Sequence, residues 1–257
     1  MSSKIKVDTI ENVAGSGNVS LGSGHNLVVP GTLSITGAST LTGAVTANSG
    51  VTLGGTTPTL TIGDAGEEDT KIVFDGNAQD FHIGLDDSAD SLTIGLGSAL
   101  GTTSHMVIDA TGAITKPLQP AFLANPATAG SSPVQTNISS GTTITFGNEV
   151  FDQNNDFASN TFTAPVTGKY QFNVGLFLEQ VDTDYTELRI KLVTSNRNYD
   201  HFDIGSPFSS DRNLQYHLSA LADMDASDTA TIQVTFHNGG NQMDVNALTY
   251  FSGYLVC

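Results

Sequence analysis

Apolar and polar residues alternate along most of the second half of the chain, which is the period of a strand with one buried face. Between residues 170 and 178 this alternation places an aromatic or aliphatic side chain at every second position. It returns at Ile144 and Phe146, and in the stretches 188–192, 214–220, 232–236 and 248–256. Polar turns separate these stretches at intervals that fit a sandwich of two antiparallel sheets.

The first quarter of the chain has a different pattern. Between Glu11 and Asp64 there is no Asp, Glu, Lys or Arg, and apolar residues come in short alternating pairs such as Leu33 and Ile35, separated by glycine and small polar residues. Burying an aliphatic side chain contributes about 1.5–3 kcal/mol, whereas ordering each residue of backbone costs about 1–2 kcal/mol, so one chain cannot order these repeats alone. We expect residues 16–63 to form a shaft of three intertwined chains. A disordered linker is the alternative, which the low charge disfavours.

Residues 64–117 combine acidic residues with longer apolar stretches. The stretches 72–74, 81–85, 92–96 and 106–108 read as strands, and Asp75-Gly76 is a turn signal. We expect a small β meander that is marginal as an independent unit and trimerises with the shaft. Two prolines stiffen the following segment, 116–120, which places a domain boundary before residue 118.

Composition predicts an all-β fold and argues against nucleic-acid binding and membrane insertion. Only 14% of residues are charged, and Gly, Ser, Thr and Asn favour strands and turns. A net charge of -17 without a basic cluster argues against binding nucleic acid. No apolar run approaches the ~18 residues of a membrane span, and Cys257 is the only cysteine, so neither membrane insertion nor an intrachain disulfide is expected. The N-terminus lacks the apolar segment of a signal peptide, which predicts synthesis in a cytoplasm.

One set of residues in the C-terminal half closely resembles the signature of the complement C1q globular head, a jelly roll related to tumour necrosis factor. These residues are Phe146, Asp152, Phe157, Phe162, Gly168, Tyr170 and Phe172. The segment 120–124 resembles the first strand of that domain, and the segment with Phe251 and Gly253 resembles the last. The sequence departs from the family at Val174, where an aromatic residue is common, and in a shorter spacing between Phe157 and Phe162.

The resemblance implies a jelly-roll head over residues 118–257. It implies a homotrimer whose central and final strands pack about a threefold axis, and distal loops that are used for recognition. The shaft needs partner chains for the energetic reason given above, so two parts of the chain predict the same oligomer.

The N-terminal repeats resemble a second class of protein. The segment 31–46 is similar to repeats of bacteriophage tail fibres and other virion appendages, and the segment 4–10 looks like the N-terminus of such proteins. In residues 1–15 the apolar positions are Ile5, Val7 and Ile10, which we expect to dock on other virion proteins. A frayed terminus is the alternative.

Candidate chemistry is sparse. The six histidines lack a diagnostic neighbourhood, and no nucleophile elbow, zinc-binding helix motif or phosphate-binding loop is present, so we expect no enzyme. Paired acids with one intervening residue can direct two carboxylates at one ion. The resemblance to the C1q head implies calcium as the candidate ion, because some relatives of that head bind it. The paired acids Asp182, Asp184, Asp223 and Asp225 are the candidate ligands. Solvated turns are the alternative.

Together these patterns predict a homotrimeric structural fibre of a virion, such as a phage tail fibre, assembled in the host cytoplasm. The intertwined β shaft carries the jelly-roll head, which binds a protein or glycan of the host surface. A capsid-surface or connector fibre, whose head mainly registers the three chains, is the first alternative. A polysaccharide depolymerase that uses Asp182 with Asp184, or Asp86 with Asp87, is less favoured because the chain has no tryptophan to stack on a sugar.

Overall fold

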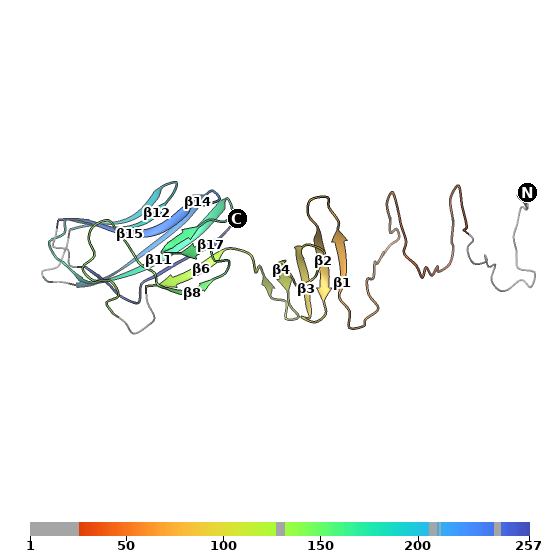
Figure 1. Cartoon of the computed structure of the whole chain (residues 1–257), viewed down its shortest axis with the longest axis horizontal. Coiled ribbons are helices and arrows are strands. Elements are labelled where there is room, and N and C mark those ends of the chain that lie inside the picture. Colours follow the sequence, from red (N-terminus) through yellow and green to blue (C-terminus); the bar gives the residue numbers. More distant parts are fainter. Residues whose placement is uncertain (1–25, 127–131, 206–209, 211, 239–242) are drawn as a thin grey trace, which may run out of the picture. The chain divides into compact units, whose positions relative to one another are not determined.

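The computed structural model describes residues 26–126, 132–205, 210, 212–238 and 243–257. In these ranges all regular structure is β, with strands numbered β1 to β17 (Figure 1). None of the segments described there is a helix long and apolar enough to cross a membrane. The chain divides into two compact units, residues 1–60 and 61–257.

The described part of the first unit, residues 26–60, contains no strand, and its side chains are exposed. Leu33 and Ile35, one of the expected pairs, are 60% and 55% exposed. The short strands expected here therefore do not form within a single chain, and the intertwined trimeric shaft stays a prediction. The expected docking residues Ile5, Val7 and Ile10 lie outside the described residues.

The second unit begins with a meander of five strands, which we call the meander sheet. Its strands are β1 (Thr70–Phe74), β2 (Phe81–Asp86), β3 (Ser91–Leu96), β4 (Ser104–Ile108) and β5 (Ile114–Thr115), and they pair antiparallel in sequence order. The four expected strands are confirmed, and β5 extends the sheet by one short strand.

The head is a sandwich of two antiparallel sheets, as the alternation predicts. The first sheet has the order β14 (Arg212–Met224), β11 (Gly168–Val181), β17 (Tyr250–Leu255), β6 (Ala121–Asn125), β8 (Asn148–Asp152), and β16 (Asp244–Val245) also pairs with β11. The second has the order β13 (Asn198–Ile204), β12 (Glu187–Thr194), β15 (Thr229–His237), β10 (Thr161–Thr163), β9 (Phe157–Ala158), and β7 (Thr142–Thr143) also pairs with β15. Neighbouring strands come from distant parts of the sequence, as in a jelly roll (Figure 1).

The core lies between the inner faces of these sheets. Strand β11 buries Tyr170, Phe172, Leu176 and Leu178, and the alternation along β12 and β15 buries the facing aliphatic residues. The predicted alternation is therefore confirmed for these strands.

One expected strand is wrong in detail. Ile144 and Phe146 are buried, but the strand β7 stops at Thr143. The backbone N–H of Thr145 donates to the Gln135 side chain at 2.9 Å, and that of Phe146 donates to Asn160 Oδ1 at 2.7 Å. Side-chain acceptors thus replace the ladder while burial is kept.

Candidate functional site

The signature aromatics meet in one cluster inside the head. The Phe122 ring stacks on Phe157 at 4.8 Å and on Phe162 at 5.1 Å, and it meets Phe251 edge-on at 4.9 Å between centroids. Phe146, Tyr170 and Phe172 complete the cluster, and all of these rings are buried. Stacked and edge-on pairs add about 0.5–1.5 kcal/mol each beyond burial, so the cluster is a large share of the core's packing energy.

The other signature residues fix the backbone around this cluster. The Asp152 carboxylate accepts hydrogen bonds from the backbone N–H of Asp156 at 3.1 Å and of Phe157 at 2.9 Å, which closes the turn before β9. A Cβ on Gly253 would lie 2.6 Å from the Phe172 ring, and a Cβ on Gly168 would lie 2.7 Å from the Cys257 carbonyl oxygen. These positions hold the scaffold together and present no side chain to a ligand.

The four candidate calcium ligands do not gather. Asp182 and Asp184 lie in the turn after β11, where Asp182 Oδ1 accepts from the Asp184 backbone N–H at 3.4 Å. Asp223 pairs with Lys169 at the start of β11, whereas Asp182 follows the end of the same strand. The length of β11 therefore separates the two pairs, and at about 3.3 Å per residue this distance is roughly 40 Å.

Asp223 and Asp225 also have other partners. Arg197 Nη2 is 2.7 Å from Asp223 Oδ2, and the Asp225 backbone N–H donates to Asp228 Oδ2 at 2.8 Å. Across the ranges that the structure describes, no three His, Cys, Asp or Glu residues are placed to hold a metal ion. Within one chain, the four residues therefore do not form a calcium site.

Most of the charged side chains of the second sheet lie on its outer face. The register of β12 with its neighbours sets them in rows, with Glu187 between Ile204 and His237, Arg189 between Phe202 and Thr235, and Lys191 between Asp200 and Gln233. We call Glu187, Arg189, Lys191, Asp200, Phe202 and His237 the charged face. A sheet holds such side chains at fixed spacings, so the face is organised before any partner arrives.

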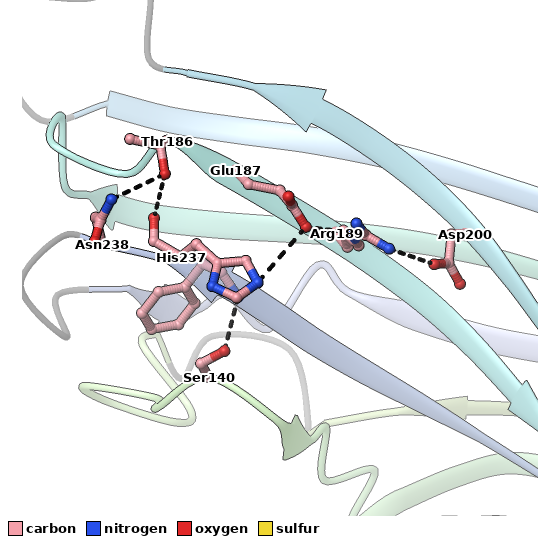
Figure 2. A network of polar contacts seen from close by, with 8 residues as sticks. Ser140, Thr186, Glu187, Arg189, Asp200, His237 and Asn238 are labelled. Carbon is pink, nitrogen blue, oxygen red and sulfur yellow. Dashed lines mark hydrogen bonds and ion pairs between the residues drawn. The ribbon is translucent and has the colours of Figure 1, made fainter.

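Arg189 is the centre of the charged face. Its Nε donates to Glu187 Oε1, and its Nη1 lies 3.6 Å from Asp200 Oδ2 (Figure 2). Its Cζ lies 4.7 Å from the centroid of the Phe202 ring. The hydrogen bond to Glu187 raises the pKa of Arg189, so the guanidinium stays charged. Arg189 and Phe202 are 37% and 46% exposed, so a partner can reach both the cation and the ring.

The end of β15 extends this network. His237 Nε2 is 4.0 Å from Glu187 Oε1, and the His237 carbonyl accepts from the Thr186 backbone N–H at 2.9 Å. Asn238 Nδ2 donates to Thr186 Oγ1 at 3.2 Å, as Figure 2 shows. One residue before His237, the Phe236 backbone N–H donates to Ser140 Oγ at 2.9 Å. These bonds tie the ends of β12 and β15 to each other and to the 139–141 turn.

Three central rows on the outer face of the first sheet have the opposite chemistry, and we call them the neutral face. One row across the sheet contains Ser219, Asn173, Ser252, Leu123 and Phe151, the next contains Leu221, Gln171, Tyr254 and Ala121, and a third contains His217, Gly175 and Tyr250. These rows contain no Asp, Glu, Lys or Arg. Phe151, Leu221 and Tyr254 are 50%, 55% and 48% exposed.

Neutral polar groups of this face bond to one another. Gln171 Nε2 donates to Ser219 Oγ at 2.9 Å, and Ser219 Oγ donates to Asn173 Oδ1 at 2.9 Å. His217 is exposed on this face, in agreement with its expected place on the polar side of its strand.

Sequence reasoning did not single out the charged face. Its central residues depend on the pairing of β12 with β13, and no strand was predicted at 198–204, where aromatic and acidic residues are mixed. The available signal was the charge at alternate positions Glu187, Arg189 and Lys191 on a strand whose other face is apolar.

Comparison with known proteins gave one structural similarity and one family match. The globular domain of the zebrafish complement 1qA protein is similar to the chain, with 21% identity and a TM-score of 0.40, and the similarity covers 54% of this chain and 98% of the zebrafish chain. A search of curated proteins gave no match. Residues 122–256, more than half of the 257 residues, match the C1q domain family. The chain therefore belongs to the C1q domain family.

Proposed function

We propose that the protein is a homotrimeric virion fibre, such as a phage tail fibre, whose C1q-like head binds a component of the host cell surface. C1q-like domains commonly trimerise and bind ligands, and they are not enzymes. The observation that carries the binding role is the contrast between the two outer faces of the head, since one is suited to contact identical chains and the other to contact a different partner.

The neutral face supports the trimer. A chain with net charge -17 repels its copies, so identical chains associate best through a surface without acidic groups. Exposed aromatic and aliphatic residues with internally bonded amides and hydroxyls match the composition of interface cores. Phe151, Leu221 and Tyr254 are the apolar anchors of this contact.

The charged face supports recognition. Arg is enriched at binding hot spots, and Arg and Phe are both enriched in protein interfaces. The guanidinium of Arg189 and the carboxylates of Glu187 and Asp200 offer donors and acceptors within one small area, which suits a protein surface or a glycan. The Phe202 ring supplies the apolar contact.

The N-terminal part supports the fibre. Residues 26–60 expose aliphatic side chains along a segment without charge, and such a segment buries these side chains only when several chains combine. The similarity of residues 31–46 to repeats of phage tail fibres is the reason to place the protein on a virion, with its N-terminus fixed to the particle.

Competition for adsorption tests the proposal. Purified full-length protein should inhibit adsorption of particles to host cells in a saturable manner, and antibody against the head should label intact particles. Arg189→Ala and Phe202→Ala should each weaken this inhibition by at least about tenfold, which corresponds to 1.4 kcal/mol.

Arg197→Ala is the matched control. Arg197 also pairs with an aspartate, but outside the charged face, so its loss should leave inhibition unchanged. Unlabelled particles would refute the virion location. Labelled particles whose adsorption the wild-type protein does not inhibit would favour a connector fibre.

A further inference from the structure

The meander sheet has its apolar residues on the side that its own chain leaves open. The strand register sets these side chains in three rows. The rows are Phe74, Phe81, Leu96; then Ile72, Ile83, Ile94, Met106; then Leu85, Leu92, Ile108, Ile114. We call this surface the apolar meander face. Exposed fractions reach 55% at Phe74 and 61% at Ile114.

On the opposite side of the same sheet, the residues at its centre are polar and covered. His82 and Thr93 are 0% and 2% exposed, and His82 Nδ1 lies 2.9 Å from the Gly97 carbonyl oxygen. Gly84 has no side chain because a Cβ there would lie 2.8 Å from Leu100 Cδ2. The 97–103 turn thus closes over the polar side.

This arrangement reverses the usual one, in which a sheet buries its apolar side and exposes its polar side. Soluble monomers rarely expose contiguous apolar patches larger than a few hundred Å². The apolar meander face also lacks any charged residue, because Lys71 and Asp86 are at positions that face the other side. The face is therefore built to be covered.

We propose that the apolar meander face packs against the same face of two further copies of this chain, forming a second trimeric core separate from the head. This inference rests on the proposed homotrimer. Only residues 116–120 separate β5 from β6, and five residues span at most about 17 Å, so three assembled heads bring three meander sheets close together. Short tethers of this kind give effective concentrations in the millimolar range.

Copies of this chain fit the face better than other occupants do. A partner that binds a strongly acidic chain through charge would place its basic groups opposite acidic residues. The apolar meander face has no acidic residue for such a partner to bind. Its three aliphatic and aromatic rows suit an identical apolar surface, whose burial contributes about 25 cal/mol per Å².

Thiol labelling of the full chain tests the inference. In a Cys257→Ser background, Ile83→Cys places a thiol in the middle row, and Val73→Cys places one on the opposite side of the sheet. The two native residues are almost equally exposed in the single chain, at 37% and 36%, so Val73 is the matched control. If copies cover the face, maleimide should modify the thiol of Ile83→Cys at least about tenfold more slowly than that of Val73→Cys.

Native mass spectrometry of the same samples separates the failure of this inference from that of the proposed trimer. A trimer in which both thiols react equally fast would overturn the second core and leave the head trimer standing. A monomer would refute the homotrimer itself. A monomer with a protected Ile83→Cys thiol would show that another segment of the same chain covers the face, and this too would overturn the inference.

Discussion

Single residues of the head show which structural roles can be predicted from sequence and which cannot. Gly253 and Phe172 belong to the family signature, and their relation is steric, since the ring occupies the space that a side chain at position 253 would fill. Phe122 lies at the centre of the aromatic cluster although it was predicted only as part of the first strand. Its role depends on rings that come from four other strands and the 144–147 segment, and local sequence does not contain that information.

Asp156 is a residue at which the fold includes an unfavourable interaction. Its Oδ2 is buried without a hydrogen-bond partner, and burial, together with the nearby Asp152 carboxylate, raises the pKa of Asp156 above 3.8. The ionised carboxylate therefore destabilises the folded head at neutral pH. As the pH falls through the raised pKa, the folded state takes up the proton and this cost disappears.

Asp156→Asn should accordingly increase the free energy of unfolding at pH 7, by at most about 1 kcal/mol because Asp156 is only partly buried and solvent screens the interaction. The gain should shrink on acidification and vanish below the pKa of the unfolded carboxyl group. Urea unfolding of wild type and variant measures the difference. The measurements should run from about pH 3, below the pKa of the unfolded carboxyl group, to about pH 8. Asp184→Asn, at an exposed position, should show no comparable gain. A gain that grew on acidification would contradict the assignment.

At the scale of elements, regular alternation predicted the strands well and irregular backbone poorly. The long strands β11, β12, β14 and β15 were predicted because one face of each is apolar at every second position. The strand predicted at 144–146 was wrong because the backbone N–H groups of Thr145 and Phe146 donate to the side chains of Gln135 and Asn160. Strand β13 was missed because both of its faces contain polar or acidic residues.

The neutral face makes a prediction at this scale. Leu221→Asp introduces a charge into the proposed subunit contact, and burying three unpaired carboxylates near a threefold axis is strongly unfavourable. We expect the variant to be a monomer in native mass spectrometry, with an unchanged circular dichroism spectrum because Leu221 is on the outer side of its strand.

Ile204→Asp is the matched control for this test. Ile204 is 76% exposed and lies on the outer side of the other sheet, so a charge there should leave the trimer intact. Dissociation of Ile204→Asp, or a trimeric Leu221→Asp, would place the subunit contact elsewhere.

At the scale of the whole molecule, the sequence predicted the all-β sandwich. It did not predict which apolar surfaces a single chain leaves exposed. The energetic comparison for residues 16–63 predicts that several chains are needed, and no pattern in a single sequence contains the geometry of partner chains. The same holds for the meander sheet. Its strands were predicted, but the 97–103 turn, which joins β3 to β4, also lies against Gly84 of β2, and this contact is seen only in three dimensions.

Amide hydrogen exchange of the full chain should reveal whether the shaft depends on the head. In the wild type, we expect residues 26–60 to exchange slowly, because interchain hydrogen bonds protect their amides. In Leu221→Asp the same amides should lose this protection, while those of β12 and β15 stay protected as the internal control. Slow exchange of residues 26–60 in a monomeric variant would contradict the intertwined shaft.

Strand order in the first sheet also bears on how the protein is made. Strand β17 lies between β11 and β6, so β6, the first strand of the head to be synthesised, has β17 as its neighbour on one side and β8 on the other. The Phe122 ring of β6 likewise gains its contact with Phe251 only after β17 has been synthesised. Almost the entire head must therefore be synthesised before β6 has both of its neighbours, and until then the nascent chain exposes strand edges that are prone to pair with other chains.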